Sequence, residues 1–357
     1  MSAFPVQPIA IWFGRVGDMI MLTALLDILQ RRFGRPCWVI GAGSWSRDIY
    51  AGQPEVAQTL WLHRYTPFVL DVRWWGTVWR LLRDRRVVVY VCETDPRKLA
   101  GIRRVLRWGR VDPGRCVFLS EHPAVLSQVH WVDKLVSLGR LLPPALREQD
   151  YPWPVPAPRC APRLVLSHAA RAAGDEWLRR HEVGDRPLVL LQPGNRRTMR
   201  GRSLRIRDSD DRFWPIDRWT ALIHRIHERL PAARIVLCGA PREEVLLEWI
   251  EAAAALPGVV LRGLPFPGLF ALCARAHSMI SIDTGTAHAA AALGTPLVVL
   301  FGSTPPPTVM PRSPCGSAVI GVGGAPLLPR VDQLPVSAVF EAWTSLLTSE
   351  ADAATAP

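Results

Sequence analysis

Short apolar runs alternate with helical patterns along most of this 357-residue chain, and this alternation constrains the fold more than any other feature of the sequence. The run from Pro8 to Phe13 predicts a buried strand, and apolar residues at helical spacing between Asp18 and Arg32 predict a helix directly after it. Repetition of this pattern is typical of βαβ units, which form a mostly parallel sheet covered by helices. We therefore expect an α/β fold.

The same pattern predicts the other elements. Further strands are expected at Cys37–Ile40, Val87–Val91, Val117–Leu119, Leu164–Ser167, Leu188–Gln192, Arg234–Cys238, Met279–Ile282 and Leu297–Phe301. Further helices are expected at Val72–Arg83, Trp214–Leu230, Glu243–Ala255, Thr286–Leu293 and Val336–Leu347. The last nine residues, Ser349–Pro357, are predicted to be a frayed tail.

A proline-rich segment divides this pattern into two halves. Five of the twelve residues from Tyr151 to Pro162 are proline, which excludes a helix and favours a linker. The length of the chain also fits about two domains. We expect a Rossmann-like N-terminal domain at residues 1–162, which includes this linker, and a Rossmann-like C-terminal domain at 163–335, followed by a helix and tail at 336–357.

The charge balance is strongly basic. The chain has 43 basic and 31 acidic residues, a formal net charge of +12, and Lys98 and Lys134 are its only lysines. Arginine preference in a GC-rich genome is one explanation. An anionic partner is another, whether phosphates, nucleic acid or an acidic membrane surface. Charge alone does not choose between them.

The cysteines and the N-terminus indicate the cellular compartment of the protein. The seven cysteines are dispersed, with no CxxC pair and no histidine at zinc spacing, which argues for a reducing compartment and against a disulfide framework or a structural zinc. Met1 to Ile11 lacks the pattern of a signal peptide, and no window of about 18 uncharged apolar residues occurs. We expect a cytoplasmic protein, which can still contact a membrane from that side.

The first candidate site follows the first strand. Gly14 and Gly17 flank a turn that leads into a helix, where glycine lets the backbone approach a ligand closely. Asp18 lies in the first turn of that helix, where the dipole favours an ionised carboxylate that can act as a base. Asp is also a common helix cap, so a purely structural role remains open.

The second candidate follows the strand Leu188–Gln192 and begins at Pro193-Gly194-Asn195. An excursion of 196–211 comes next, and the stretch from Arg196 to Arg212 holds seven arginines. Long charged loops inside α/β domains are functional or solvated, and guanidinium groups match phosphate oxygens. Arg212 stands apart because it directly precedes Phe213-Trp214-Pro215 and the start of a helix.

The third candidate is Ser281 to His288, at the end of one strand and the start of an alanine-rich helix. Thr284, Gly285 and Thr286 offer donors at a helix N-terminus, which favours an anion. Asp283 ends a strand, where parallel sheets bind ligands. His288 fits either a buried core position or a ligand contact.

A fourth pattern combines aromatic and basic residues. The helix 72–83 contains Trp74, Trp75 and Trp79 together with Arg73 and Arg80, and further arginines follow at Arg83, Arg85 and Arg86. Tryptophan with arginine fits a membrane interface. A core helix with an arginine-covered outer face explains the pattern as well.

Together these motifs resemble the ADP-heptose:lipopolysaccharide heptosyltransferases, which form glycosyltransferase family 9. The resemblance extends through most of the chain, is weakest from Trp45 to Leu142, and depends on the order and spacing of several motifs. These motifs are Gly14-Arg15-Val16-Gly17-Asp18, Gln192-Pro193-Gly194, Arg212-Phe213-Trp214-Pro215, Ser281–His288, Leu293-Gly294-Thr295-Pro296 and Phe301-Gly302-Ser303-Thr304.

The resemblance implies a GT-B fold, with two Rossmann-like domains facing across a cleft, and an inverting transfer of heptose or a similar sugar from ADP-heptose to a lipopolysaccharide core or related glycolipid. Asp18 would be the general base. Arg212 would replace the family's usual lysine at the donor phosphate, Asn195 would lie near that phosphate, and Asp283 would hold the transferred sugar. The implied roles of the remaining residues are diphosphate binding for Thr284, Gly285 and Thr286, a donor contact for His288, and a weaker nucleotide site at Gly239 and Glu243.

No metal and no cofactor are implied, because arginine and a helix N-terminus would neutralise the diphosphate. The implied partners are a nucleotide-sugar, an anionic glycolipid or glycan acceptor and, peripherally, the cytoplasmic face of the inner membrane. Gln192 replaces the family's usual histidine, and the loop 196–211 is longer than expected, so another nucleotide-sugar donor stays open. The alternative from another class is an arginine-rich nucleic-acid-binding protein, although the loop lacks interleaved aromatic residues and no nucleic acid is expected as a partner.

Overall fold

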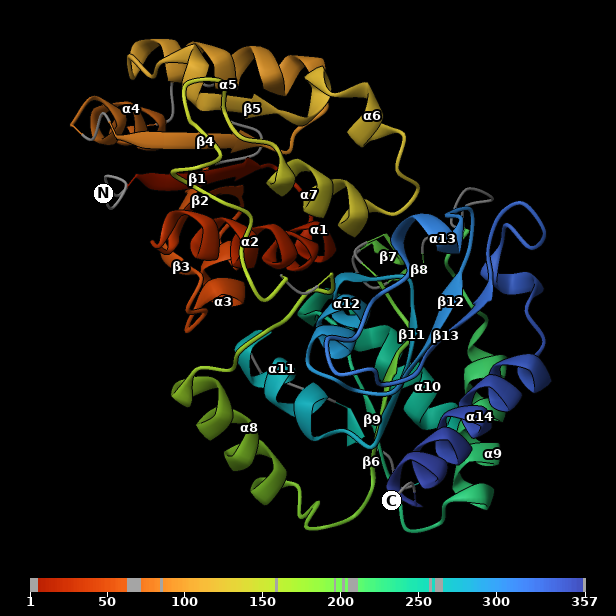
Figure 1. The fold of residues 1–357 in the computed structure, drawn as a ribbon. Coiled ribbons are helices and arrows are strands. Elements are labelled where there is room, and N and C mark those ends of the chain that lie inside the picture. Colours follow the sequence, from red (N-terminus) through yellow and green to blue (C-terminus); the bar gives the residue numbers. More distant parts are fainter. Residues whose placement is uncertain are drawn as a thin grey trace. The chain divides into compact units, whose positions relative to one another are not determined.

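The chain folds into two compact units, Met1–Val165 and Leu166–Pro357, and each contains its own parallel sheet. The structure is a computed structural model, and it describes residues 6–62, 72–83, 86–157, 160–195, 197–200, 203–204, 211–256, 259–260 and 266–355. Both units alternate strands and helices along the chain (Figure 1). The α/β architecture predicted from the alternating pattern is therefore confirmed.

The first unit is built on a five-stranded parallel sheet with the strand order β3-β2-β1-β4-β5. Its central strands are buried on both faces, as expected of a parallel sheet between two helical layers. The strands are β1 (Gln7–Trp12), β2 (Cys37–Ala42), β3 (Val56–Leu62), β4 (Val87–Val91) and β5 (Cys116–Phe118).

Helices cover both faces of this first sheet (Figure 1). Ile9, Val89 and neighbouring odd-numbered strand residues pack against α4 and α5 in one core cluster, while α2 contacts β1, β2 and α7 on the opposite face. The helices are α1 (Val16–Met21), α2 (Thr23–Phe33), α3 (Trp45–Tyr50), α4 (Val72–Arg83), α5 (Pro96–Trp108), α6 (Pro123–Leu126) and α7 (Trp131–Arg140).

The second unit contains a six-stranded parallel sheet with the order β10-β9-β6-β11-β12-β13. The strands are β6 (Leu188–Gln192), β9 (Arg234–Leu237), β10 (Val259–Val260), β11 (Ser278–Ile282), β12 (Leu297–Phe301) and β13 (Val319–Gly323). A separate antiparallel pair, β7 (Met199–Arg200) and β8 (Ser203–Leu204), lies within the arginine-rich excursion.

Two core clusters fill the two faces of the second sheet. Leu191 and Ile280 face α9, α10 and α14, whereas Leu190 and Met279 face α8, α11 and α12 (Figure 1). The buried Trp343 of α14 donates a hydrogen bond to Ser278 Oγ at 2.9 Å, which joins the C-terminal helix to this unit. The helices are α8 (His168–Arg180), α9 (Ile216–Arg229), α10 (Glu244–Ala254), α11 (Phe266–Arg275), α12 (Gly285–Ala292), α13 (Pro306–Val309) and α14 (Val336–Thr355).

Three predictions from the sequence are wrong. The helix expected from Asp18 to Arg32 is two helices, α1 and α2, joined at Leu22, and the first of them begins at Val16, so the turn before it is shorter than predicted. Helix α14 continues to Thr355, eight residues past its predicted end, because the alanine-rich tail has a high helix propensity.

The third error is the strand predicted at Leu164–Ser167, which does not form. The backbone there is satisfied by side chains of the first unit: Val165 exchanges two hydrogen bonds with the Gln53 amide, and the Arg163 N–H donates to Thr23 Oγ1 at 3.1 Å. Backbone groups that already have hydrogen-bond partners are not available for pairing with a neighbouring strand.

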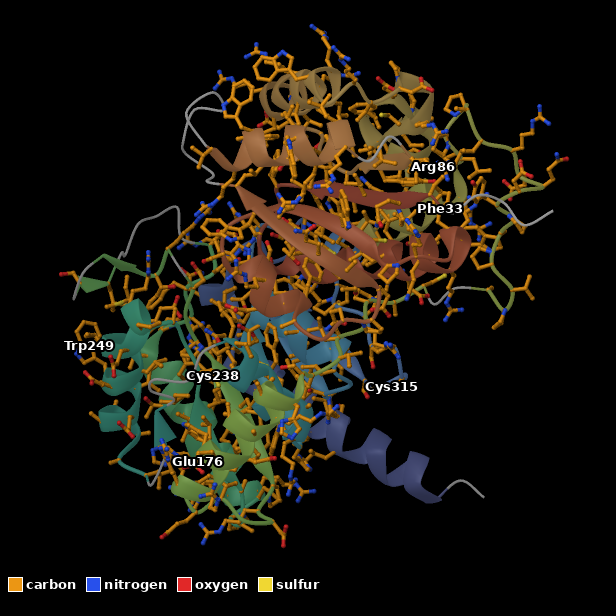
Figure 2. The ribbon with its side chains drawn as sticks, turned by 90° about the vertical axis from the view of Figure 1, so that its left-hand side faces the viewer. Phe33, Arg86, Glu176, Cys238, Trp249 and Cys315 are labelled. Carbon is orange, nitrogen blue, oxygen red and sulfur yellow. The ribbon has the colours of Figure 1, made fainter. Side chains whose placement is uncertain are left out.

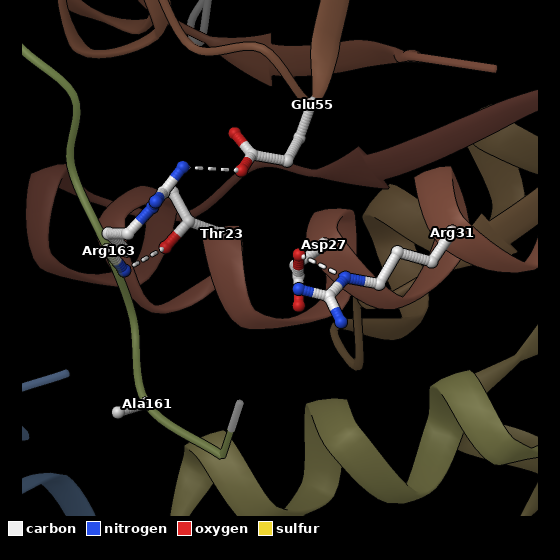
Figure 3. A pocket seen from close by; sticks show the side chains of 6 residues that line it. All are labelled: Thr23, Asp27, Arg31, Glu55, Ala161 and Arg163. Atoms are coloured by element: carbon white, nitrogen blue, oxygen red, sulfur yellow. Dashed lines mark hydrogen bonds and ion pairs between the residues drawn. The ribbon is translucent and has the colours of Figure 1, made fainter. Parts of the chain in front are cut away.

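The proline-rich segment also lies against the first unit rather than apart from it. The buried Arg32 side chain donates to the carbonyl of Tyr151 at 2.9 Å, and the Tyr151 ring packs on Phe33. Close by, Arg163 and Glu55 form an ion pair at 3.4 Å beside a cavity of about 60 Å³ (Figure 3). A polar cavity of this size has room for ordered water.

Candidate functional site

Each sheet has one position where the chain reverses the direction in which it adds strands. In the first sheet this switch point lies between β1 and β4, and in the second it lies between β6 and β11. Ligands of open α/β sheets bind at such points, beyond the carboxyl ends of the strands, because the connections diverge there and leave a crevice. The first three motifs singled out from the sequence follow these strands.

Asp18 lies beyond the carboxyl end of β1, in the first turn of α1. Its Oδ2 accepts a hydrogen bond of 2.6 Å from the backbone N–H of Arg15, so Asp18 does cap the helix as the structural interpretation expected. Gly14 packs directly beneath it, and a Cβ at this position would overlap the Cβ of Asp18. Gly17 lies within the first turn of α1 rather than in the preceding turn.

The environment of Asp18 also suits a base. Burial raises the pKa of this carboxyl above its ordinary value, and the Arg15 hydrogen bond and the charges of Arg15 and Lys98 offset only part of that effect. The nearby Glu93 raises the pKa further. A carboxylate that has lost part of its solvent holds a proton more strongly, which is what a general base requires.

Glu93 and Lys98 were not identified from the sequence. Glu93 follows β4 and is buried, with its Oε1 accepting from the N–H groups of Thr94 and Asp95 and its Oε2 paired to Lys98 Nζ at 3.1 Å. The signal was available: Glu93 comes just after a fully apolar strand, and Lys98 is one of only two lysines in the chain.

In the second unit, Asp283 and Arg212 form the central contact. Asp283 follows β11 and is 7% exposed, and its Oδ2 lies 3.0 Å from Arg212 Nη2. Arg212 also donates to the Asp283 carbonyl at 2.8 Å and to Thr304 Oγ1 at 3.0 Å. The guanidinium therefore joins two motifs that lie about seventy and ninety residues away in sequence.

Asp211 strengthens the same junction. Its Oδ2 accepts from both the N–H and the hydroxyl of Ser303 at 2.6 Å, and a Cβ at Gly302 would overlap the Asp211 carbonyl. Partial burial raises the pKa of Asp211, but the Ser303 hydrogen bonds and the Arg212 charge outweigh it and hold the pKa below its ordinary value. In the sequence, Asp211 is only the last residue of the excursion 196–211.

Helix α12 begins directly after Asp283. Thr284 is its N-cap, yet the Thr284 hydroxyl lies 3.2 Å from Ser281 Oγ and makes no cap to the helix. Gly285 and Thr286 are the first two helical residues, so their N–H groups point out of the helix end. His288 is 6% exposed and lies one turn farther along the helix.

The weaker nucleotide site at Gly239 and Glu243 has a structural explanation. Glu243 is 3% exposed, and its Oε2 accepts from the Ala240 N–H at 2.9 Å. Burial raises the pKa of Glu243, with partial relief from that hydrogen bond, from Arg242 and from Gln192. The carboxylate packs against Gly239 and Gly194, so it holds the loop after β6 against the loop after β9.

Asn195 organises the turn after β6. Its Oδ1 accepts from the Arg197 N–H at 2.7 Å, and its own N–H donates to the buried Thr198 hydroxyl. Its Nδ2 is buried and has no hydrogen-bond partner within the described residues. Residues 196, 201–202 and 205–210 of the arginine-rich loop, like Arg85 of the fourth motif, lie outside those residues.

The described part of the chain contains neither a metal-binding cluster nor a membrane-spanning helix. No group of three or more His, Cys, Asp or Glu side chains there is arranged to hold a metal ion. No helix among the same residues is long and apolar enough to cross a membrane.

Comparison with known proteins identifies relatives of both the sequence and the fold. The family model of glycosyltransferase family 9 (heptosyltransferase) matches residues 100–324, more than half of the chain. A lipopolysaccharide heptosyltransferase 3 of Escherichia coli is 35% identical over 95 residues, which are 26% of this chain and 27% of that protein. The chain thus aligns with about a quarter of the length of that curated relative.

Solved structures match over nearly the whole chain. The E. coli ADP-heptose lps heptosyltransferase II has a TM-score of 0.69 at 20% identity, covering 96% of this chain and 99% of that one. The E. coli heptosyltransferase WaaC with ADP has a TM-score of 0.65 at 17% identity, covering 95% and 99%. These likenesses confirm the predicted fold class, GT-B with two Rossmann-like domains.

Proposed function

The chain belongs to glycosyltransferase family 9, and we propose that it is an inverting glycosyltransferase that moves a heptose from ADP-heptose to a lipopolysaccharide core or related glycolipid. The observation that carries the proposal is the pair of carboxylates at the two switch points. Asp18 is partly buried and has a raised pKa, whereas Asp283 is bound to an arginine, so the two differ as a base and a sugar-holding group should.

Asp18 is the proposed general base. Its carboxylate takes the proton from an acceptor hydroxyl while that oxygen forms a bond to the anomeric carbon of the donor sugar. The bond from the anomeric carbon to the diphosphate oxygen breaks, and the nucleoside diphosphate leaves with the electron pair. Attack opposite to the leaving group inverts the anomeric configuration.

The second unit supplies the proposed donor site. The N–H groups at the start of α12, from Gly285 and Thr286, are placed to hydrogen-bond the diphosphate, and Arg212 neutralises the charge that develops on it. Asp283 accepts hydrogen bonds from the hydroxyls of the transferred sugar. Asn195 and His288 are proposed donor contacts, and the unpartnered Asn195 Nδ2 supports that role.

A second candidate keeps the chemistry and changes the donor nucleotide. The carboxylate of Glu243 is the nearest candidate for a ribose, but it is buried and already accepts the Ala240 N–H. No other residue argued above selects adenine. A family 9 transferase that uses another nucleotide-sugar for a surface polysaccharide is therefore the alternative.

The proposed partners follow from this chemistry. They are a nucleotide-sugar, with ADP-heptose favoured because a heptosyltransferase of the same fold binds ADP, and a lipopolysaccharide-type acceptor. We propose a cytoplasmic location with the acceptor presented at the inner membrane. The domain roles are acceptor binding for the N-terminal domain and donor binding for the C-terminal domain.

A donor screen with turnover tests the proposal. The full chain is incubated with heptose-deficient lipopolysaccharide and, in parallel, ADP-heptose or GDP-, UDP- and dTDP-sugars, and the nucleoside diphosphate released is measured. Release only from ADP-heptose, with a product of inverted configuration, is expected. Turnover with another donor selects the second candidate function. Absence of turnover with every donor contradicts both candidate functions.

A further inference from the structure

Helix α4 carries two apolar stripes, and only one of them faces the core. Trp74, Val78 and Leu81 are buried against the sheet of the first unit. The other stripe follows the helical repeat at intervals of three and four residues and lies on the solvent side. Its members and their exposed fractions are Val72 at 79%, Trp75 at 47%, Trp79 at 59% and Leu82 at 37%.

The outer stripe continues onto the neighbouring helix α5. Trp108 at the end of α5 is 37% exposed, and its ring stacks on Trp75 with centroids 5.1 Å apart and planes 8° from parallel. Arg83 lies over the ring of Trp79 at 5.3 Å. We call Val72, Trp75, Trp79, Leu82 and Trp108 the tryptophan surface. Large apolar side chains gathered in this way on one face mark an interaction site.

The charged residues within the two helices that carry this surface are all basic. Helices α4 and α5 together contain eight basic side chains and no acidic one. Two of these side chains pair with acids of other segments, Lys98 with Glu93 and Arg103 with Glu121. Arg86, which follows α4 and is labelled in Figure 2, is exposed as well. The eight are Arg73, Arg80, Arg83, Arg97, Lys98, Arg103, Arg104 and Arg107.

We propose that the tryptophan surface and its arginines bind an anionic phospholipid bilayer. Tryptophan rings prefer the membrane–water interface, where the ring is partly buried and its N–H stays in polar surroundings. Arginines beside them gain from the negative surface potential. Arg83 borders the apolar stripe directly, so the occupant must meet apolar rings and positive charge side by side, as acyl chains below anionic headgroups do. The inference goes beyond the proposed function, since it requires neither donor nor acceptor.

Vesicle flotation tests this inference with the full chain and no substrate. Wild-type protein is mixed with vesicles of phosphatidylcholine alone, or of phosphatidylcholine with phosphatidylglycerol, at physiological ionic strength. We expect flotation with the anionic vesicles. Trp75→Ser with Trp79→Ser should weaken binding at least about tenfold, because binding scales with the apolar area buried in the interface. Arg83→Gln with Arg107→Gln should weaken it about fivefold per arginine, on anionic vesicles only.

Two matched controls lie in the second unit. Trp249, labelled in Figure 2, is 39% exposed on α10, and Arg171 is exposed on α8. Trp249→Ser and Arg171→Gln should float like the wild type, and circular dichroism should show every variant folded. Equal flotation of wild type and tryptophan variant overturns the proposal, as does absence of wild-type binding. It is also overturned if the tryptophan variant changes only the oligomeric state in light scattering, which would identify a second copy as the occupant.

Discussion

One carboxylate lies at the switch point of each sheet, and the surroundings of the two differ. Asp18 follows the first strand at the switch point of one sheet, where burial raises its pKa and one backbone N–H is its hydrogen-bond donor. Asp283 follows the strand at the switch point of the other sheet, where Arg212 binds both its carboxylate and its carbonyl. The contrast shows how one topology supplies both a proton acceptor and a fixed hydrogen-bond acceptor.

Local packing produces this difference. Gly14 allows the Asp18 side chain to lie against the backbone, where it is partly buried. Arg212 reaches Asp283 because Asp211, the preceding residue, is held by Ser303 and because Thr304 accepts from the guanidinium. Removal of either support should change one carboxylate and leave the other as it is, which makes the comparison testable.

Asp18→Asn should have the largest effect. Asparagine still accepts the Arg15 N–H but cannot take a proton, so turnover should fall by about 10²- to 10⁴-fold. Donor affinity should stay near that of the wild type, because the donor is assigned to the other unit. Product release and donor titration by calorimetry measure the two quantities. Asp48→Asn, at an exposed position on α3, is the control.

The same variant has a stability readout. The pKa of Asp18 is raised in the folded chain, so its ionisation at neutral pH destabilises the fold. The stabilisation that protonated Asp18 provides is complete below the ordinary carboxyl pKa. It is lost as the pH rises through the raised pKa of the folded chain. Asp18→Asn should therefore melt at a higher temperature than wild type at neutral pH, and the difference should disappear in acid. A lower melting temperature at neutral pH would contradict the desolvation argument.

Arg212→Met comes next in size. It removes the partner of a buried carboxylate and the hydrogen bond to Thr304, so kcat/KM should fall about a hundredfold. The kcat/KM of Arg212→Lys should lie between those of the wild type and Arg212→Met, since an ammonium keeps the charge but cannot form the paired hydrogen bonds of a planar guanidinium. Arg179→Met, beside the surface residue Glu176 labelled in Figure 2, should be neutral. If Arg212→Met keeps wild-type donor affinity and turnover, Arg212 is structural only.

Gly14→Ala should give a smaller loss. The added Cβ overlaps that of Asp18, which costs about 1–3 kcal/mol and displaces the carboxylate. Gly76→Ala on α4 is the control, because its nearest neighbour is the end of the Arg80 side chain at 3.6 Å. That change should stabilise the helix by about 0.5–1 kcal/mol. Urea unfolding compares the two, and equal stabilities would show that Asp18 is not held by this close approach.

The smallest effects concern pH. The acidic limb of the kcat/KM profile should follow the raised pKa of Asp18, so activity falls as pH drops through it. Glu93→Gln removes a negative charge and should move this limb to lower pH. Lys98→Met removes a positive charge and should move it to higher pH. Shifts in the same direction in both variants would contradict the electrostatic account.

Local patterns predicted much of the fold. Helix α4 and strands β4, β6 and β12 have the bounds expected from sequence, and β6 and β12 are short, mainly apolar runs with proline or glycine directly on both sides. Strand β13 was missed, since two glycines interrupt it and only its register with β12 identifies it. The run Leu164–Ser167 looks equally strand-like, but Gln53 had already paired its backbone.

The tryptophan-rich helix shows the same limit. Sequence alone left a core helix and a membrane-facing helix open, and the structure contains part of both: Trp74 is buried, while Trp75 and Trp79 are exposed. Helical spacing allows either face to point inward. The packing of α4 against the sheet and α5 selects one.

The sequence by itself determined the α/β pattern, the resemblance to family 9 and the candidate residues that lie within a motif, such as Asp18 and Asp283. These depend on neighbours along the chain. The tertiary structure alone decided which distant groups meet: Glu93 and Lys98 beside Asp18, and Arg212 and Thr304 at Asp283. The reason is physical, since solvent exclusion and charge pairing act through space, and strand order, which no local pattern encodes, sets the distances.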